Sequence, residues 1–496
     1  MTSAISLNQN SLSRLPDGVA RPMYDRGQVT TGIVHVGVGG FHRSHEAFYT
    51  DQLLQSGGAS EWGICGVGLR EADRRMATIL KQQDYLYTLI VKHPDGGVET
   101  KVIGSIVDFL MGPDDPTAVI DRMADPATKI VSLTITEGGY NVDPATGQFD
   151  ASNPDAQHDI DHPEQPRLVF GYLTAALRKR REHGLPAFTV QSCDNIQHNG
   201  DLTRQMLVGF ARLQDADLAD WIEQEVCFPN AMVDRITPVT TESDIEYLRS
   251  TFGIEDKWPV VCEPFCQWVV EDRFSAGRPE WLNVGAQFVP DVSPYETMKL
   301  RLLNAGHSML GIPGAVYGYG TIDECVRDDV FCRFLRQFFD VEVTPVLGPV
   351  EGIDLEEYKS SLIERFGNPS IRDDVSRICL GSSSKLPVFL FPTVRENLAR
   401  GGSIELAALV IAAWCCYSDR HADRFGNPLV INDELKDELH AAARGTSDDR
   451  LSFLRVESVF GDLVNNERFT KTYVSMVDRI YQSPDMRRHM QDAMDG

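Results

Sequence analysis

A short run of β-branched residues ends directly in a cluster of glycines near the start of the chain. The run Gly32–Val36 is followed by Gly37-Val38-Gly39-Gly40, and a stretch with the spacing of a helix extends from His42 to Ser56. Glycines at a strand-to-helix turn let the backbone bend sharply and approach a pyrophosphate, whose charge is met by amides at the helix N-terminus. His42 stands where the usual fingerprint has its third glycine. The turn predicts a dinucleotide site in an α/β domain, with an ordinary tight turn as the alternative.

Short apolar runs alternate with helix-favouring segments over the first part of the chain. Two of these runs flank Pro94-Asp95-Gly96-Gly97, which predicts a hairpin. Short strands that alternate with helices are typical of a mostly parallel sheet covered on both faces. The expected strands are 32–36, 62–68, 85–92, 99–108, 129–136 and 187–192.

The pattern changes after Pro294, where strand-like runs become rare. The helical patterns beyond that point are 296–310, 328–339, 355–366, 404–418 and 433–444. We therefore predict an α/β chain in which an N-terminal Rossmann-type domain with a parallel sheet precedes a mainly α-helical C-terminal domain. The predicted divisions are an irregular N-terminal arm at 1–29, the dinucleotide-binding domain at 30–290, and a helical substrate and catalytic domain at 291–496.

Acidic residues outnumber basic ones in this chain. Asp plus Glu is 72 and Lys plus Arg is 47, which gives a formal net charge of −25. Such a surface repels nucleic-acid phosphates and anionic lipids, so we expect small-molecule chemistry and neither a nucleic-acid nor a membrane partner. The apolar run 406–417 is too short to span a bilayer, and residues 1–32 hold no hydrophobic segment of the signal-peptide type. Ten scattered cysteines without a CxxC pair indicate buried thiols, and we expect a cytoplasmic protein.

A polar stretch at 141–166 is rich in Pro, Asp and Asn, and we interpret it as a surface loop or an insertion. Residues of metal-ligand type cluster in it, but no predicted helix or strand fixes their positions. We therefore expect no metal site there. These residues are Asp155, His158, Asp159, Asp161 and His162.

The acidic residue that would bind the adenosine ribose is expected at the end of the second strand. Glu71 and Asp73 come about 30 residues after the glycines, later than the usual spacing of about 20. A carboxylate would repel a 2′-phosphate and so favours NAD, whereas Arg70, Arg74 or Arg75 would accept NADP. The alternative is a charged helix N-terminus, where Glu71 and Asp73 suit the macrodipole.

A second candidate site lies on the predicted helix that begins at Ser293-Pro294-Tyr295-Glu296, a capping-box pattern. At about 100° per residue, Glu296, Asn304 and His307 lie within about 140° of Lys299 on one face. Alcohol oxidation needs a base for the hydroxyl proton, and a desolvated lysine suits that role. An amide donor such as Asn304 can hold the reacting oxygen. The alternatives are a surface lysine, a capping glutamate and a core histidine.

Five ordered motifs together resemble the polyol-specific long-chain dehydrogenases, from about Thr31 to the C-terminus. This resemblance implies metal-free interconversion of a polyol and its ketose, of the mannitol and fructose type, with NAD or possibly NADP as cofactor. It also implies an N-terminal Rossmann domain, a mainly helical C-terminal domain and an active site between them. The motifs are Gly37-Val38-Gly39-Gly40-Phe41-His42-Arg43, Thr134-Ile135-Thr136-Glu137, Ser192-Cys193-Asp194-Asn195, Glu263-Pro264-Phe265-x-Gln267-Trp268, and the set Lys299, Asn304 and His307.

The resemblance also implies roles for individual residues. Lys299 is expected to be the general acid/base, Asn195 and Asn304 to clamp the reacting oxygen, His307 to assist positioning, and Glu296 to gate proton passage to water. Asn195 also follows a predicted strand, where α/β sheets place functional residues, although an Asx turn is its alternative. The expected substrate contacts are Asp234, Arg377 and Lys385. The expected cofactor-binding residues are Val36, Gly37, Val38, Gly39, Gly40, Phe41, His42, Arg43, Arg70, Asp73 and Glu137; Gly138 stands where the family often has a lysine.

Two other functions stay open at this stage. A fructuronate or mannonate oxidoreductase of the same superfamily would need an arginine for the substrate carboxylate, and Arg377 keeps that alternative open. A non-catalytic NAD-binding sensor would have no need for Lys299, Asn304 and His307. No heptad seam is visible and the charge is strongly negative, so we expect a monomer.

Overall fold

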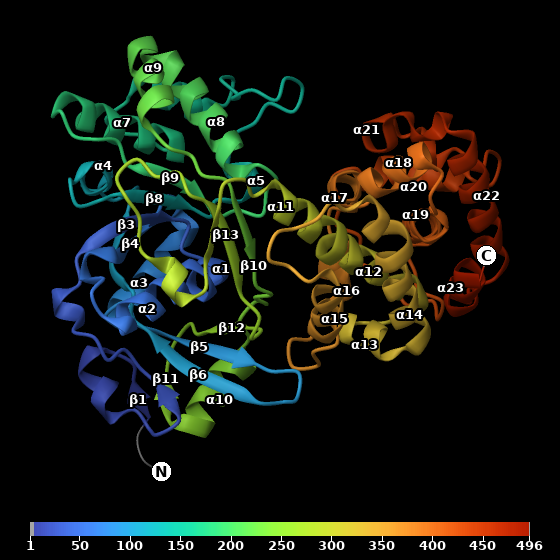
Figure 1. The fold of residues 1–496 in the computed structure, drawn as a ribbon, viewed down its shortest axis with the longest axis horizontal. Helices are drawn as coiled ribbons and strands as arrows, with labels where there is room; N and C mark the ends of the chain where they lie inside the picture. The colour runs from blue at the N-terminus through green and yellow to red at the C-terminus, as the bar shows by residue number, and fades with distance from the viewer. Residues whose placement is uncertain (1–3, 496) are drawn as a thin grey trace. The chain divides into compact units, whose positions relative to one another are not determined.

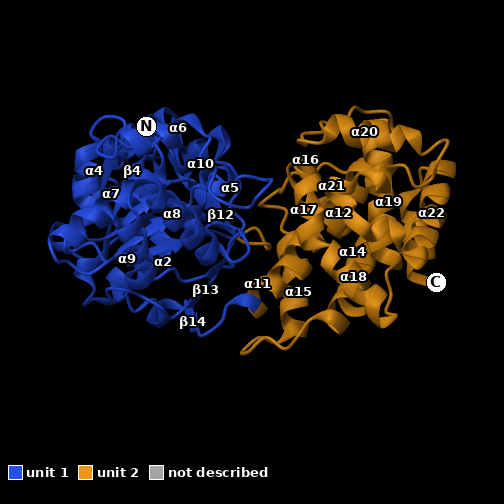
Figure 2. Ribbon diagram, turned by 90° about the horizontal axis from the view of Figure 1, so that it is seen from above, with its two compact units in different colours: residues 1–92, 97–293 blue, residues 93–96, 294–496 orange. Residues whose placement is uncertain are grey.

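The computed structural model describes residues 4–495, and the chain divides into two compact units. The first unit comprises residues 1–92 and 97–293, and the second comprises residues 93–96 and 294–496 (Figure 2). The division falls between Ser293 and Pro294, close to the point in the sequence after which strand-like runs become rare.

A five-stranded parallel sheet organises the first unit. Its strand order is β7-β4-β3-β8-β9, and every neighbouring pair is parallel. With the first strand at the centre and the order reversing around it, this is the dinucleotide-binding arrangement, which confirms the expected fold class. The strands are β3 (Thr31–Val36), β4 (Gly63–Gly68), β7 (Ile106–Met111), β8 (Ile130–Leu133) and β9 (Thr189–Ser192).

Helices cover both faces of this sheet (Figure 1). Alternate residues of a strand point to opposite faces, so Val34 and Val36 pack in one core and Ile33 in the other. The Val34 face packs against helices α4 (Pro116–Ala124), α7 (Val169–Glu182), α8 (Asn199–Gln214) and α9 (Ala216–Glu225). The Ile33 face packs against α2 (Glu46–Ser56) and α3 (Arg74–Gln82).

Smaller sheets complete the first unit. The predicted hairpin is formed by β5 (Tyr87–Lys92) and β6 (Val98–Ile103), which pair antiparallel. The hairpin lies in a sheet of order β12-β5-β6-β2, with β12 (Val260–Cys262) and β2 (Val19–Ala20) at its edges. A further sheet has the order β10-β13-β14 and consists of β10 (Ala231–Asp234), β13 (Gln267–Glu271) and β14 (Gln287–Val289).

The irregular arm expected at 1–29 contains, over residues 4–29, two two-residue strands and two short 3-10 helices. Strand β1 (Ile5–Ser6) pairs with β11 (Ile254–Glu255), and β2 pairs with β6. The arm therefore belongs to the first unit, because its spaced apolar side chains bury against distant strands. This small core consists of Leu7, Leu12, Leu15, Val19, Leu86, Val102 and Ile254.

The polar stretch at 141–166 contains a helix, α6 (Pro154–Asp161), which the sequence analysis did not predict. The Asn153 side chain caps this helix by accepting from the N–H of Asp155. Asp159 is fully buried and accepts the N–H groups of Arg167 and Leu168 at 2.8 and 2.9 Å. Asp159 thus accepts hydrogen bonds from the backbone just before α7, and its role is structural.

The second unit is built from helices, and no strand longer than an isolated bridge occurs within its described residues, 93–96 and 294–495. The central helix α19 (Glu405–Arg420) is buried almost throughout and packs on α12, α20 and α22. No helix among residues 4–495 is long and apolar enough to cross a bilayer. The longer helices are α12 (Ala305–Tyr317), α14 (Asp329–Gln337), α15 (Leu355–Phe366), α18 (Phe391–Arg400), α20 (Lys436–Gly445), α22 (Glu467–Gln482) and α23 (Met486–Asp495).

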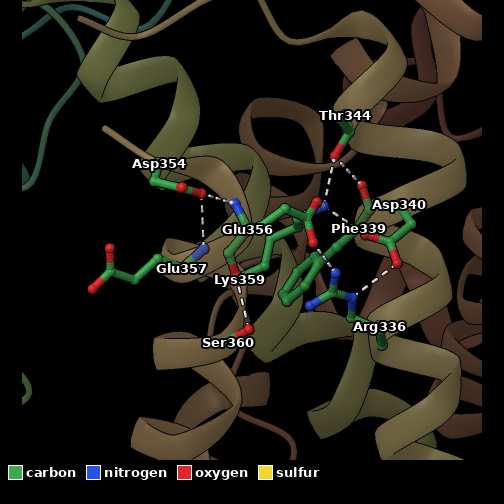
Figure 3. Close-up of polar contacts among 9 residues, drawn as sticks. All are labelled: Arg336, Phe339, Asp340, Thr344, Asp354, Glu356, Glu357, Lys359 and Ser360. Carbon is green, nitrogen blue, oxygen red and sulfur yellow. Dashed lines mark hydrogen bonds and ion pairs between the residues drawn. The ribbon is translucent and has the colours of Figure 1, made fainter. Parts of the chain in front are cut away.

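A buried lysine of α15 pairs with Asp340 in the π-helical segment Phe338–Val343, which follows α14 (Figure 3). Lys359 is 1% exposed, and its Nζ lies 2.6 Å from Asp340 and also contacts Glu356. Arg336 contacts the same two carboxylates, so two cations alternate with two anions. Because the carboxylates reach solvent, this network keeps the buried ammonium paired without burying the anions.

A buried glutamate holds the start of the central helix. Glu342 lies in the π-helical segment Phe338–Val343 and is fully buried. Its carboxylate accepts the N–H groups of Leu406 and Ala407 at 2.8 and 3.1 Å and the Ser403 hydroxyl at 3.1 Å. Burial raises the pKa of Glu342 to about 7, although these donors counteract that rise. Glu342 therefore serves as a cap for α19 from outside the helix.

Replacing Glu342 by Ala should destabilise the second unit, because two buried N–H groups lose their acceptor. We expect the free energy of unfolding to fall by about 1–3 kcal/mol, measured by chemical denaturation. Asp354→Ala, which removes an exposed cap at α15, should cost about 1 kcal/mol or less and serves as the control.

The wild type should also lose stability relative to Glu342→Gln as the pH rises. A raised pKa in the folded state means that the folded chain binds this proton more tightly than the unfolded chain. The stabilising contribution is complete below about pH 4.5 and is lost as the pH rises through about 7. Parallel Tm profiles of the two proteins from pH 5 to 8 would contradict this assignment.

Candidate active site

The glycine-rich turn lies at the carboxyl end of the central strand β3, as a dinucleotide site requires. Gly37 has a φ of +96°, and a Cβ at this position would overlap the carbonyl oxygen of Thr134. Only glycine fits both the conformation and the close approach of β8. Helix α1 (Gly40–Ser44) follows at once and runs into α2. The backbone of Gly37 to Gly40 is partly exposed and open to a ligand.

Several side chains of this motif point into the unit rather than towards a ligand. Val36 packs in the core, and His42 and Arg43 are each 1% exposed. The Arg43 guanidinium donates to the Trp258 carbonyl at 2.6 Å and lies over the Tyr87 ring. His42 and Arg43 can therefore offer a dinucleotide only their backbone, whereas Val38 and Phe41 are half-buried.

The ribose candidates follow strand β4. The Asp73 carboxylate accepts the N–H groups of Leu69 and Arg70 at 3.1 and 2.9 Å, which fixes the turn after the strand. Glu71 is paired with Arg74 at 2.6 Å, and Arg74 is also paired with Asp114 at 2.9 Å. Because two carboxylates already neutralise Arg74, the local charge favours ribose hydroxyls over a 2′-phosphate.

A buried carboxylate links the carboxyl ends of β8 and β9. Asp194 accepts the N–H groups of Ile135 and Thr136 at 3.0 and 2.8 Å and the Tyr140 hydroxyl at 2.8 Å. Burial raises the pKa of Asp194, and the donors around it oppose that shift. Thr136 has a φ of +59°, so Asp194 holds a strained turn in place. Asp194 was absent from the predicted site residues, although the motif Ser192-Cys193-Asp194-Asn195 contains it.

Three further predicted residues of the first unit lie at strand ends. Glu137 lies in the short helix α5 (Thr136–Gly139), just after β8, and its side chain is exposed. Asn195 follows β9 and is also exposed. Asp234 is the buried last residue of β10 and pairs in register with Gln267 of β13. The structure therefore places Glu137 and Asn195 at the same edge of the central sheet as the glycine-rich turn.

The lysine helix is not one regular helix. Helix α11 (Ser293–Lys299) is followed by the π-helical segment Leu300–Asn304 and then by α12. The constant 100° advance predicted from the sequence is therefore wrong between Lys299 and Asn304, because a π turn holds more residues than an α turn. Such segments occur frequently at functional sites.

The polar side chains of this helix are largely buried. Glu296, Lys299 and His307 are 3%, 7% and 8% exposed. The Asn304 Oδ1 atom is buried, and no protein group within the described residues bonds to it. Asn304 thus has a buried oxygen that can accept a hydrogen bond from a ligand hydroxyl group.

An acidic residue that the sequence analysis did not single out lies beside His307. The Asp373 carboxylate holds the Arg377 guanidinium in two hydrogen bonds at 2.7 and 2.5 Å, and its Oδ2 lies 3.8 Å from His307 Nε2. The His307 ring also packs on Phe366 at 4.2 Å. Arg377, in the middle of α16 (Val375–Cys379), is exposed, while Lys385 on α17 (Ser382–Phe389) is half-buried. No repeating pattern predicts Asp373, since only the fold brings it to His307.

Each unit therefore has its own chemistry. The first unit carries a glycine-rich turn and, after β4, the carboxylates of Glu71 and Asp73, which can accept hydrogen bonds from ribose hydroxyls. The second unit carries an amine, an amide and an imidazole on one bent helix, a set that can accept a proton and hold an oxygen.

Comparisons with known proteins identify the family to which the chain belongs. The sequence profile of the mannitol dehydrogenase Rossmann domain matches residues 31–283, and that of the mannitol dehydrogenase C-terminal domain matches residues 291–481. The chain is 46% identical to mannitol 2-dehydrogenase of Aspergillus fumigatus over 96% of this chain and 97% of that one. It is 44% identical to a mannitol dehydrogenase of Saccharomyces cerevisiae over 97% and 96% of the two chains.

Two solved structures share the fold over nearly the whole chain. Pseudomonas fluorescens mannitol 2-dehydrogenase, in a ternary complex with NAD and D-mannitol, has a TM-score of 0.88 and 44% identity, with 99% of each chain covered. A substrate-free D-sorbitol dehydrogenase has a TM-score of 0.91 and 38% identity, with 99% of this chain and 100% of that chain covered. The resemblance found in the sequence is confirmed, and the chain belongs to the mannitol dehydrogenase family.

Proposed function

We propose that this protein is an NAD-dependent dehydrogenase that interconverts a polyol and its ketose, with mannitol and fructose as the leading pair. The observation that carries this proposal is the near-complete match to a structure containing NAD and D-mannitol. The residues of this chain fit the cofactor, because the Gly37 turn and the carboxylates after β4 suit a pyrophosphate and a ribose.

Bound NAD supplies the acceptor for the hydride that leaves the carbinol carbon. Lys299 takes the hydroxyl proton as the carbon–oxygen double bond forms, and returns it to the ketose oxygen in the reverse reaction. Asn304 and Asn195 donate to the oxygen on which charge develops. His307, packed on Phe366 and close to Asp373, positions the substrate, and Glu296 passes the proton between Lys299 and water.

The charge around Arg377 favours a polyol over a sugar acid. Asp373 already neutralises the Arg377 guanidinium through two hydrogen bonds, so a substrate carboxylate would have to compete with it. Asp234, Arg377 and Lys385 are then contacts for substrate hydroxyls. Initial rates with mannitol, arabinitol, sorbitol and mannonate test this choice, and a preference for mannonate would overturn it.

Lys299→Ala should lower the rate of polyol oxidation by several orders of magnitude, because the proton acceptor is lost while NAD binding is retained. Asn195→Ala and Asn304→Ala should each cost about a hundredfold in kcat, the usual loss for one oxyanion donor. Stopped-flow measurement of NADH formation checks both expectations.

Two controls sharpen this test. Lys471→Ala removes an exposed lysine on α22 and should leave the rate unchanged. A small primary amine added to Lys299→Ala should restore part of the rate, because only a proton acceptor is missing. Near-normal turnover of Lys299→Ala would remove Lys299 from the mechanism and reopen the sensor alternative.

Replacing Glu71 and Asp73 by Ala should raise the use of NADP relative to NAD. The change removes two carboxylates that repel a 2′-phosphate and releases Arg74 from one of its partners. The ratio of kcat/KM for the two cofactors measures the effect. Asp73→Asn is the control for the structural role of Asp73, and an unchanged ratio in the double variant refutes the ribose assignment.

We also propose that the protein acts as a monomer in the cytoplasm. The net charge of −25 opposes self-association, and all ten cysteines are free thiols, as is usual in a reducing compartment. We expect light scattering at micromolar concentration to give the monomer mass of 55.3 kDa. A stable dimer would contradict the proposal.

A further inference from the structure

A buried polar cluster lies directly beneath the glycine-rich turn. The parallel register of β3 and β8 sets His35 beside Ser132, and alternation turns both side chains away from the Val34 face. Glu46, in the first turn of α2, reaches the same place. His35, Ser132 and Glu46 are each 1% exposed or less.

Hydrogen bonds run from this cluster to the turn. The Glu46 Oε2 atom lies 3.0 Å from His35 Nδ1 and accepts the Ser132 hydroxyl at 2.9 Å. On the other side of the ring, His35 Nε2 lies 2.9 Å from Thr134 Oγ1. The Thr134 hydroxyl in turn donates to the Gly37 carbonyl at 2.7 Å. One continuous chain therefore connects Glu46 to the first glycine of the turn.

The direction of one hydrogen bond follows from its acceptor. The carbonyl of Gly37 can only accept, so the single hydroxyl proton of Thr134 is used there, and His35 Nε2 donates to Thr134. At the other ring nitrogen, His35 Nδ1 lies 2.8 Å from Ser132 Oγ and 3.0 Å from Glu46 Oε2. The negative charge of the cluster lies on Glu46.

The neighbouring His42 fits this charge distribution. Its ring stacks on that of His35 with centroids 3.4 Å apart and planes 14° apart. Burial and the nearby His35 lower the pKa of His42 to about 3, so His42 is neutral. Burial alone would raise the pKa of Glu46, but its contacts with His35 and His42 hold that pKa below its ordinary range. The Glu46 carboxylate is thus an anion in a dry site beside two imidazole rings.

A metal ion is the obvious alternative occupant, since donor atoms of His35, His42 and Glu46 lie within 4.8 Å of one another. The geometry does not suit it. Two nearly parallel stacked rings cannot aim their lone pairs at a common point, and both nitrogens of His35 already lie within hydrogen-bond distance of the Ser132 and Thr134 hydroxyl groups.

We propose that the buried Glu46–His35 pair, acting through Thr134, is the positioning device that fixes the Gly37 carbonyl and thereby shapes the glycine-rich turn for NAD. This proposal rests on the proposed binding of NAD at that turn. Gly37 is held from both sides, because its Cα lies against the Thr134 backbone while its carbonyl accepts from the Thr134 side chain. The pair touches neither cofactor nor substrate, so its loss acts on cofactor binding and not on the proton-transfer step.

The test is direct titration of NADH binding by fluorescence, without turnover, on the full-length protein. Glu46→Gln keeps the shape but removes the anion and should raise the Kd for NADH by about tenfold or more. Thr134→Val leaves Glu46 and His35 unchanged, removes the hydroxyl group that links them to Gly37, and should raise the Kd by about threefold. In both variants the KM for the polyol should stay within about twofold of the wild type, since the change is confined to the cofactor turn.

A matched control separates positioning from general destabilisation. Asp159→Asn removes a fully buried carboxylate that also accepts two backbone N–H groups, but it lies in α6 and not at the turn. It should lower the Tm as Glu46→Gln does and leave the Kd for NADH unchanged. If Asp159→Asn raised the Kd for NADH as much as Glu46→Gln does, loss of stability alone would explain the effect of Glu46→Gln, and the proposal would be overturned.

The remaining outcomes are equally decisive. Failure of the wild type to bind NADH would overturn the proposed function itself, whereas a normal Kd in both Glu46→Gln and Thr134→Val would overturn only this inference. Stoichiometric metal in the purified wild type that is lost in Glu46→Gln, measured by plasma mass spectrometry, would show that these residues form a metal site and overturn the proposal.

Discussion

The close approach of Gly37 to Thr134 is the constraint on which the arrangement of the first unit depends. Strand β3 must stop at Gly37 because a positive φ turns the chain there, and only a residue without a Cβ allows the carbonyl of Thr134 so near. The same contact places the end of β8 beside the turn, and with it the segment that leads to Glu137. The cofactor turn and the next loop along the sheet are thus fixed by one backbone contact.

Carboxylates that bind backbone or imidazole protons surround this contact. Asp73 fixes the turn after β4, Asp194 fixes the turn after β8, and Glu46 acts below the glycines. Each is held by several donors, so the loops at the carboxyl end of the sheet have little freedom to lose when a ligand binds. In the second unit Glu342 does the same for α19, the helix on which α12 packs. Rigid supports of this kind suit a site whose hydride donor and acceptor must be held at a fixed separation.

What could be predicted from the sequence follows from how local each signal is. The glycine-rich turn, the hairpin at Pro94-Asp95-Gly96-Gly97 and the change to helices after Pro294 depend on neighbouring residues, and the structure has all three. The packing of the N-terminal arm depends on partners such as Leu86 and Ile254, far away in sequence, so its apolar residues gave no readable pattern. Asp194 and Asp373 were not predicted as site residues for the same reason, since their partners are defined only once strands and helices have packed.

Two further features could not be predicted from residue spacing, the π-helical segment and the inward orientation of the His42 side chain. A helical wheel drawn at a constant 100° per residue cannot represent the extra residue per turn at Leu300–Asn304. Nothing in the composition of that segment predicts a π-helix. His42 occupies the place of a fingerprint glycine, which suggests a residue near the cofactor, yet its side chain turns inward and stacks on His35. A histidine there is explained by what lies below the turn: its neutral ring covers the Glu46–His35 pair, and a glycine would leave a cavity beside a buried charge. The departure from the fingerprint therefore belongs with the buried cluster of His35, Ser132 and Glu46 beneath the glycine-rich turn.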